Sequence, residues 1–436
     1  MKIAVAGTGY VGLVTGTCLA ETGHDVVCVD IDEAKIKVME SGVSPIYEEG
    51  LEELMQKNYA AGRIRYTTDY ATAYRESDVI FIGVGTPERP DGSCNLDYVM
   101  GVAKQIAESV VKDTLVVVKS TVPIGTNDDI EKFLKANVKP GINIEVASNP
   151  EFLAQGTAVR DTLHASRIVI GTESNNAAEI LKKVYEPFGV PILSVNRRSA
   201  EMIKYASNDF LALKISYMND IANLCELLGA DVKDVAKGMS YDERIGNRFL
   251  NPGIGYGGSC FPKDTKALRE LAKSKGYDLK TVSAAVEVNE RQQRILYTKV
   301  KNANISLKDK RVAVLGLAFK AGTDDLREAS SLKHMPLFLE DGAHIVAVDP
   351  VAEANFKKRY PEGKHGNGYI EYAPDAKSAL KDADLCIIMT EWPEFKALKP
   401  EDFTSNMKSA VVFDGRNLYE PADMRNAGIK YSCIGR

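Results

Sequence analysis

The feature that most constrains the fold is a strand, glycine turn and helix pattern that opens the chain. MKIAVAGTGYVG is an apolar run followed by glycines, and VTGTCLAETGH continues as helical sequence. VVCVD, DVIFIGVGT, TLVVVKST and IEVASNP are further apolar runs with helical sequence between them. Strands that alternate with helices predict a parallel sheet covered on both faces. KDKRVAVLGLAFK, residues 308–320, restarts this order, so we expect an α/β protein with two doubly wound parallel sheets.

The glycine turn GTGYVG, residues 7–12, indicates a dinucleotide site. Gly7 permits the tight bend, Gly9 lets a pyrophosphate approach the backbone, and Gly12 allows close packing of helix on strand. The N-terminus of the helix supplies N–H groups to the phosphates. Asp30 ends the next apolar run, where a carboxylate accepts hydrogen bonds from a ribose diol and repels a 2′-phosphate. The sequence therefore predicts a Rossmann-like domain that binds NAD rather than NADP.

A helical region separates the two α/β regions. SAEMIKYASNDFLALKISYMNDIANLCELLGA has helical periodicity without proline or an interior glycine, which predicts an unusually long helix. Such a helix suits a spine between domains or a dimer face. We expect an NAD-binding domain at residues 1–195, a central helical dimerisation domain at 196–305 and a second Rossmann-like domain at 306–436.

Composition excludes several classes of protein. The 436 residues carry a net charge of −5, which gives no reason to expect a nucleic-acid or membrane partner. No apolar run approaches the roughly 18 residues of a membrane span, and no secretion signal precedes the first strand. Seven cysteines without metal-ligand spacing argue against a zinc site or a disulfide framework. Scattered thiols suggest a reducing compartment, so we expect a cytoplasmic protein without a metal.

One cysteine has neighbours that suggest chemistry. In GYGGSCFPKD, residues 255–264, three glycines precede Cys260, and Lys263 and Asp264 follow it. A nucleophilic cysteine reacts as a thiolate, which Lys263 would favour, and Asp264 could position a water or a lysine. The glycines would let a bulky substrate lie against backbone N–H groups. A buried cysteine in a glycine-rich loop explains the same residues.

Other polar residues stand where ligands could bind. Lys204 and Asn208 are four positions apart on the long helix and share one face, although a solvated helix face has the same spacing. Thr86, Thr121 and Glu151 follow predicted strands, at the edge where doubly wound sheets bind ligands. Ordinary turn and cap chemistry also accounts for these three residues.

An NAD site and a reactive thiol together suggest one reaction. A primary alcohol loses a hydride, and the thiol of Cys260 adds to the resulting aldehyde. The thiohemiacetal then loses a second hydride and becomes a thioester, from which water releases a carboxylate.

Eight motifs in one order span nearly the whole chain: GTGYVG, GTPERPDGS, STVPIGT, SNPEFLAQGTA, KYASN, RIGNRFLNPGIGYGGSCFPKD, GLAFKAGTDDLREASS and FDGRN. This order resembles the UDP-glucose/GDP-mannose dehydrogenase family. The resemblance implies the four-electron oxidation of UDP-glucose, with two NAD⁺ and water, to UDP-glucuronate and two NADH, for polysaccharide biosynthesis. NPGIGYGG and FPKD favour UDP-glucose, and GDP-mannose or a UDP-N-acetylhexosamine is the alternative substrate.

The resemblance also implies roles for individual residues. Cys260 matches the family's nucleophile, and Lys204 and Asn208 would hold the C6 oxygen as it becomes an oxyanion. Asp264 would serve proton transfer. Glu151 matches a general base for thioester hydrolysis. Thr121 would help to orient the attacking water.

The resemblance places the ligand contacts on two sets of residues. The NAD contacts fall on Gly7, Thr8, Gly9, Tyr10, Val11, Gly12, Asp30, Lys35, Thr86, Thr121, Gln155, Lys263 and Arg327. The UDP-sugar contacts fall on Glu151, Phe152, Leu153, Lys204, Asn208, Arg244, Asn251, Gly255, Tyr256, Gly257, Phe319, Lys320 and Arg416. Arg244 would come from a neighbouring subunit of a homodimer or higher oligomer, with the long helix as the dimer core.

The chain departs from its relatives at two of these positions. Gln155 stands where some relatives have an acid, so we do not expect it to act as a base. Asn251 stands where some relatives have a lysine, which weakens a charge-based role there.

Two other classes of function have less support. A two-electron hydroxyacid or polyol dehydrogenase needs neither Cys260 nor a second α/β domain. An NAD-binding redox sensor would use Cys260 as a switch, but no residue of the catalytic set is missing.

Overall fold

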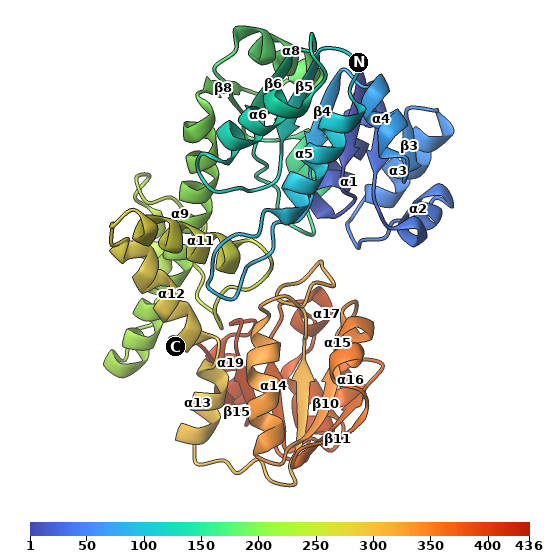
Figure 1. Ribbon diagram of the computed structural model, residues 1–436. Coiled ribbons are helices and arrows are strands. Elements are labelled where there is room, and N and C mark those ends of the chain that lie inside the picture. Colours follow the sequence, from blue (N-terminus) through green and yellow to red (C-terminus); the bar gives the residue numbers. More distant parts are fainter. The chain divides into compact units, whose positions relative to one another are not determined.

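The computed structural model describes all residues 1–436 and divides them into two compact units, Met1–Ser207 and Asn208–Arg436. Each unit contains one α/β sheet, and helices dominate the sequence between the two sheets (Figure 1). The predicted α/β class with two sheets and a central helical region is confirmed. No helix combines the length and the apolar character that crossing a membrane requires.

The first sheet has eight strands in the order β3-β2-β1-β4-β5-β6-β7-β8. Its strands are β1 Lys2–Ala6, β2 Asp25–Val29, β3 Ile64–Thr67, β4 Val79–Ile82, β5 Thr114–Val118, β6 Ile144–Ser148, β7 Ile168–Gly171 and β8 Ile192–Val195. All pairs are parallel except β6 with β7. The strand order reverses between β1 and β4, and such a switch point is where doubly wound sheets bind ligands.

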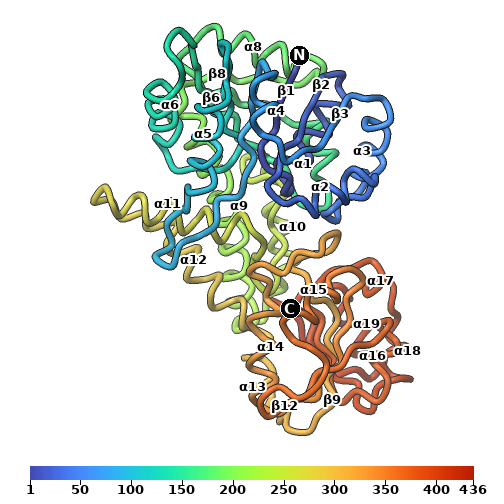
Figure 2. The backbone as a smooth tube through the Cα atoms, turned by 45° about the vertical axis from the view of Figure 1, so that its right-hand side comes forward, coloured from blue at the N-terminus to red at the C-terminus, as the bar shows by residue number.

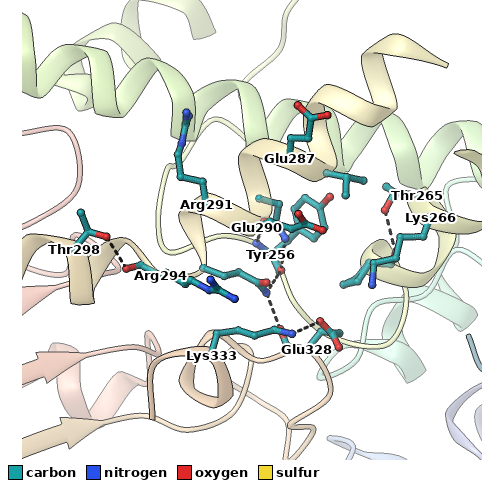
Figure 3. Close-up of a pocket in the computed structure, with 14 residues that line it drawn as sticks. Tyr256, Thr265, Lys266, Glu287, Glu290, Arg291, Arg294, Thr298, Glu328 and Lys333 are labelled. Atoms are coloured by element: carbon teal, nitrogen blue, oxygen red, sulfur yellow. Dashed lines mark hydrogen bonds and ion pairs between the residues drawn. The ribbon is translucent and has the colours of Figure 1, made fainter. Parts of the chain in front are cut away.

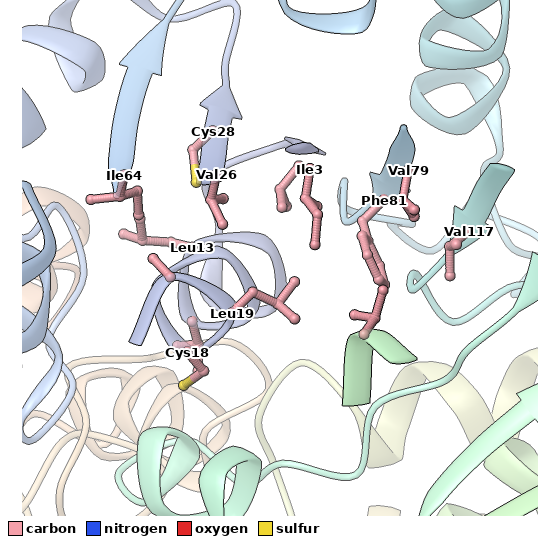
Figure 4. Close-up of a cluster of buried hydrophobic side chains, with 14 of the residues drawn as sticks. Ile3, Leu13, Cys18, Leu19, Val26, Cys28, Ile64, Val79, Phe81 and Val117 are labelled. Carbon is pink, nitrogen blue, oxygen red and sulfur yellow. The ribbon is translucent and has the colours of Figure 1, made fainter. Parts of the chain in front are cut away.

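Helices cover both faces of this sheet. They are α1 Tyr10–Glu21, α2 Glu33–Glu40, α3 Leu51–Ala60, α4 Tyr70–Glu76, α5 Asp97–Ser109, α6 Thr126–Asn137, α7 Ala158–Leu163 and α8 Asn175–Tyr185, with a 3₁₀ turn at Glu186–Phe188. On one face, Leu13 and Leu19 of α1 pack with Ile3, Val26 and Phe81 of the strands (Figure 4). Side chains of α4, α5 and α6 cover the other face. Burial on both faces explains why these strands are continuous apolar runs.

The long helix predicted from its periodicity is α9, Arg197–Leu228, with 32 residues. It begins in the first unit and ends in the second. Lys204 and Asn208 lie on it one turn apart. The helices that follow in the second unit are α10 Val232–Ser240, α11 Phe261–Ser274, α12 Lys280–Gln292, α13 Ile295–Asn302, α14 Ser330–Glu340, α15 Glu353–Arg359, α16 Ala376–Leu380, α17 Pro393–Lys396, α18 Pro400–Asn406 and α19 Pro421–Asn426.

The second sheet has seven strands in the order β11-β12-β10-β9-β13-β14-β15. They are β9 Arg311–Leu315, β10 His344–Val348, β11 Gly363–His365, β12 Gly368–Tyr372, β13 Leu385–Ile388, β14 Val411–Asp414 and β15 Lys430–Ser432. Apart from the added edge strand β11, this order repeats the arrangement around β1 of the first sheet, with β9 central. Helices α13 and α14 lie on one face, and α16, α18 and α19 lie on the other (Figure 2).

Candidate active site

The loop between β1 and α1 has the geometry predicted from its glycines. Gly7 has φ of +93°, in the left-handed region that favours glycine. A Cβ on Gly12 would lie 2.0 Å from the carbonyl oxygen of Gly7, so α1 can approach this closely only without a side chain there. A Cβ on Gly9 would meet nothing within 4 Å, so the backbone there has open space beside it. The N-terminus of α1 is therefore accessible to a pyrophosphate.

Asp30 follows β2 and holds this loop. Its Oδ2 accepts hydrogen bonds from the N–H (3.0 Å) and the hydroxyl (2.5 Å) of Thr8, and its Oδ1 accepts one from the N–H of Asp32 (3.0 Å). Burial alone would raise the pKa of Asp30, but these hydrogen bonds and the charge of Lys35 outweigh it and lower the pKa. The carboxylate is therefore ionised at neutral pH. Together, the loop and this carboxylate fit the pyrophosphate and ribose of a dinucleotide.

Two of the predicted strand-end residues lie side by side. The hydroxyl of Thr86, which follows β4, donates a hydrogen bond of 2.9 Å to the carbonyl oxygen of Thr121, which follows β5. Because β4 and β5 are parallel neighbours, their carboxyl ends meet at the same edge of the sheet.

Glu151 and Lys204 form a buried ion pair, with 2.8 Å between Glu151 Oε1 and Lys204 Nζ. Their side chains are 6% and 3% exposed, so the alternative of a solvated helix face is wrong for Lys204. The ring of Phe152 contacts two cations: Lys204 Nζ is 5.5 Å from its centroid and the Arg167 guanidinium carbon is 3.7 Å away. Removing either partner would leave the other as an uncompensated buried charge, which strongly destabilises a folded protein.

In the second unit, Asp264 binds two predicted site residues. Asn208 Nδ2 donates to Asp264 Oδ2 at 2.7 Å, and Lys263 Nζ donates to Asp264 Oδ1 at 2.5 Å. Asp264 is 1% exposed, so this carboxylate exchanges its water contacts for an amide and an ammonium group. Lys263 forms an ion pair with Asp264. Its predicted effect on the thiol of Cys260 stays a prediction.

Cys260 is partly exposed and immediately precedes α11, as its N-cap residue. Its sulfur lies 3.7 Å from the hydroxyl oxygen of Ser259. The N-terminus of a helix favours negative charge, which suits a nucleophilic thiolate.

Close packing also requires the glycines before Cys260, and this requirement was not predicted from the sequence. A Cβ on Gly257 would lie 2.3 Å from the carbonyl oxygen of Glu328, and a Cβ on Gly258 would lie 2.9 Å from the ring of Phe319. The N–H of Gly258 donates to the carbonyl oxygen of Arg327 at 2.8 Å. Packing of the loop against residues 319–328 therefore requires glycine at both positions, before any substrate is considered.

Helix α12 and the residue that caps its C-terminus, Gln293, support the same loop. Asn289 accepts from the N–H of Tyr256 (2.7 Å) and donates to its carbonyl oxygen (3.0 Å), while Gln293 donates to the carbonyl oxygens of Tyr256 and Glu328 at 2.9 Å each. A pocket of about 700 Å³ adjoins these residues (Figure 3). Cys260 is not among the residues that line it.

Cations gather near the carboxyl ends of β9 and β14. Arg416, two residues after β14, donates from Nη2 to the carbonyl oxygen of Phe319 at 3.0 Å and forms an ion pair with Glu391 at 3.1 Å. Lys320 Nζ lies 5.6 Å from the centroid of the Phe319 ring. Arg327 is paired with Asp325. A planar guanidinium held in this way can donate two parallel hydrogen bonds to phosphate oxygens.

Four further predicted site residues differ in their exposure. The side chain of Arg244 is 89% exposed and pairs with Asp242 in its own turn. Asn251 and Lys35 are exposed, and Gln155 is buried. Their predicted ligand contacts remain predictions.

Comparison with known proteins decides the family. Residues 1–189 match the NAD binding domain of the UDP-glucose/GDP-mannose dehydrogenase family, residues 198–291 its central domain and residues 313–421 its UDP binding domain. The chain belongs to the UDP-glucose/GDP-mannose dehydrogenase family. This dehydrogenase is therefore an enzyme, and its cofactor is NAD. The residues of the β1–α1 loop fit that cofactor, as described above.

Relatives of this dehydrogenase match it over its whole length. It is 47% identical to UDP-glucose 6-dehydrogenase TuaD of Bacillus subtilis, over 100% of this chain and 93% of the relative. It is 43% identical to UDP-glucose 6-dehydrogenase of Rhizobium meliloti, over 100% of both chains. A solved UDP-glucose dehydrogenase from Pyrobaculum islandicum has a TM-score of 0.91 and 36% identity, covering 99% of this chain and 96% of that one. A UDP-D-ManNAc dehydrogenase from Pyrococcus horikoshii has a TM-score of 0.87 and 29% identity, covering 100% and 99%.

Two buried ionisable residues of this dehydrogenase lie next to predicted site residues but were missed. Lys119 follows β5 and lines a small cavity together with Glu151. Asp209 is 4% exposed, and neither of its carboxyl oxygens has a hydrogen-bond partner. Burial, together with the charge of Asp264, raises the pKa of Asp209 to about 8. Lys119 directly precedes the motif STVPIGT and Asp209 directly follows KYASN, but nothing in the sequence shows that either residue is buried.

Proposed function

We propose that this enzyme oxidises UDP-glucose to UDP-glucuronate in a four-electron reaction through a thiohemiacetal and a thioester on Cys260. The observation that carries the proposal is a partly exposed thiol at the start of α11, followed by the buried carboxylate of Asp264 with its amide and ammonium partners. A two-electron dehydrogenase has no use for this thiol. The full-length relatives named UDP-glucose 6-dehydrogenase support the choice of substrate.

In the proposed oxidation of the alcohol, Lys204 and Asn208 hold the C6 oxygen, and Asp264 takes part in removing the hydroxyl proton. NAD, when bound, accepts the hydride that leaves C6 in each of the two oxidations. Charge develops on the C6 oxygen when Cys260 attacks the aldehyde carbon. An ammonium and an amide donor fixed in advance stabilise that charge.

In the proposed hydrolysis, Glu151 takes a proton from the water that attacks the thioester, and Thr121 helps to orient this water. The ion pair with Lys204 supports this role, because it holds the buried carboxylate of Glu151 in one orientation. The C–S bond breaks, and the electron pair returns to the sulfur of Cys260.

Measuring NADH formed per UDP-glucose consumed, with excess NAD at pH 8–9, tests the proposal directly. Two NADH per sugar are expected, because the alcohol and the thiohemiacetal each lose one hydride. One NADH per sugar would mean that the reaction ends at the aldehyde and would contradict the thioester route.

Another nucleotide sugar is the second candidate substrate, favoured by the similarity to a UDP-D-ManNAc dehydrogenase. The same assay with UDP-N-acetylhexosamines and GDP-mannose distinguishes the two. A higher kcat/KM for one of these sugars than for UDP-glucose would replace the proposed substrate.

We also propose that the enzyme is a homodimer formed through α9. Phe210, Tyr217 and Leu224 are seven residues apart, and with Leu227 and Leu228 they form an exposed apolar stripe with exposed fractions of 48% to 83%. An exposed row of apolar side chains on one helix is typical of an interface.

Tyr217→Glu is expected to convert the dimer to a monomer in sedimentation velocity, because a carboxylate at the centre of the stripe would lose its hydration. Tyr277→Glu, an exposed tyrosine outside α9, is the control and is expected to remain dimeric. A wild-type protein that sediments as a single chain would contradict the proposal.

Three further expectations remain proposals. We place the domain boundaries at residues 195 and 305, with uridine and diphosphate binding in residues 306–436.

Arg244 would reach the substrate of the partner subunit. A cytoplasmic location is supported by the seven cysteines, none of which forms a disulfide.

A further inference from the structure

Lys119 is a buried lysine beside the proposed general base, and none of the proposed steps uses it. It is 8% exposed, and its Nζ donates to Asn149 Oδ1 at 3.0 Å and to the hydroxyl of Tyr185 at 3.4 Å. No carboxylate lies within ion-pair distance of it. Lysines are almost never buried this deeply without a carboxylate partner, because the charged form loses its hydration.

A small cavity joins Lys119 to the proposed site. Its volume is about 40 Å³, and Lys119, Asn149, Glu151 and Tyr185 are among the residues that line it. One water needs roughly 10–15 Å³ on this measure, and polar partners to bind it. The cavity therefore has room for a short chain of waters between the ammonium and carboxylate groups.

The charges around Lys119 allow it to exchange a proton near neutral pH. Burial is the main cause that lowers the pKa of Lys119 to about 8; the charge of Lys204 contributes to the lowering, and the charge of Glu151 opposes it. Asp161 and Arg167 also line the cavity. Two further titratable groups lie beside Lys119: Cys18 on α1, whose thiol pKa burial raises to about 12, and Tyr185 on α8, whose pKa burial also raises. Cys18, like Glu151, opposes the lowering of the Lys119 pKa, but burial outweighs both.

The proposed hydrolysis leaves a proton on Glu151 that must depart before the next turnover. We propose that Lys119 accepts, through waters in this cavity, the proton that Glu151 takes from the hydrolytic water. The inference rests on the proposed function and deepens it. Water adds to the thioester carbon, the C–S bond breaks toward sulfur, one water proton passes from Glu151 to the neutral amine, and the other leaves when the product acid ionises.

The test compares Lys119→Met, which removes the charge, with Lys119→Arg, which keeps a cation that cannot lose its proton. Lys112→Met, a half-exposed lysine near the opposite end of β5, is the control. Rapid mixing with UDP-glucose and NAD, an acid quench and intact-protein mass follow the covalent adduct on Cys260. Both Lys119 variants are expected to form the adduct normally and to hydrolyse it about 10-fold to 100-fold more slowly.

The pH dependence separates a proton acceptor from a purely structural residue. The wild-type hydrolytic rate is expected to rise with pH through about 8, as Lys119 becomes neutral, and both variants are expected to lose that rise. Wild-type hydrolysis in Lys119→Arg would overturn the proton-transfer role, and unchanged hydrolysis in both would overturn any role. If Lys119→Met does not fold, the hydrolytic rate of Lys119→Arg and the pH dependence of the wild-type rate still test the proton-transfer role. A wild type that forms fewer than two NADH per sugar would overturn the proposed function itself.

Discussion

Replacing Cys260 with serine is expected to reduce steady-state formation of the acid by about 10³-fold or more, the scale of loss seen when a catalytic nucleophile is removed. A serine hydroxyl is not ionised near pH 8, whereas a thiol at the start of α11 can react as a thiolate. Without a thiohemiacetal there is no thioester, so the second hydride is not released. NADH formation and product analysis by chromatography measure both losses.

Cys94→Ser is the matched control, because Cys94 is the other partly exposed cysteine and the remaining five are buried. We expect it to retain wild-type activity. If the Cys260→Ser enzyme still formed two NADH per sugar at the wild-type rate, the covalent route would be wrong.

Asp209→Asn is expected to stabilise the folded protein, and the gain should grow with pH. The pKa of Asp209 is about 8 in the folded chain against an ordinary value of 3.8, so the folded state retains a proton that the unfolded state has lost. Each pKa unit corresponds to about 1.4 kcal/mol. The wild type therefore loses up to roughly 6 kcal/mol of stability as pH rises from about 4 to about 8, and no more above that.

Asparagine removes this loss because it has no proton to release. The gain from Asp209→Asn should be close to zero at pH 4 and largest above pH 8, measured as the free energy of unfolding in urea at several pH values. Asp309→Asn, an exposed aspartate with φ of 57° that asparagine also tolerates, is the control and is expected to have little effect at any pH. A gain for Asp209→Asn that did not change with pH would contradict the explanation.

Features that depend on local sequence were predictable. The strands and the 32-residue α9 follow from apolar periodicity, which reflects which face of each element is buried. Gly7 and Gly12 follow from a turn whose backbone angle and close packing depend on residues within one loop. The motif order extended this prediction to the family and to the residues of the candidate site.

The amino-acid sequence by itself thus determined the α/β elements, the dinucleotide turn and the identity of the candidate site residues, because those depend on short segments. Only the tertiary structure decided which charges are buried and paired. Glu151 and Lys204 are 53 positions apart, and Asn208 and Asp264 are 56 apart, so their contacts exist only after distant segments pack. The burial of Lys119 and Asp209 likewise depends on the elements packed around them, and burial is what shifts the pKa of each.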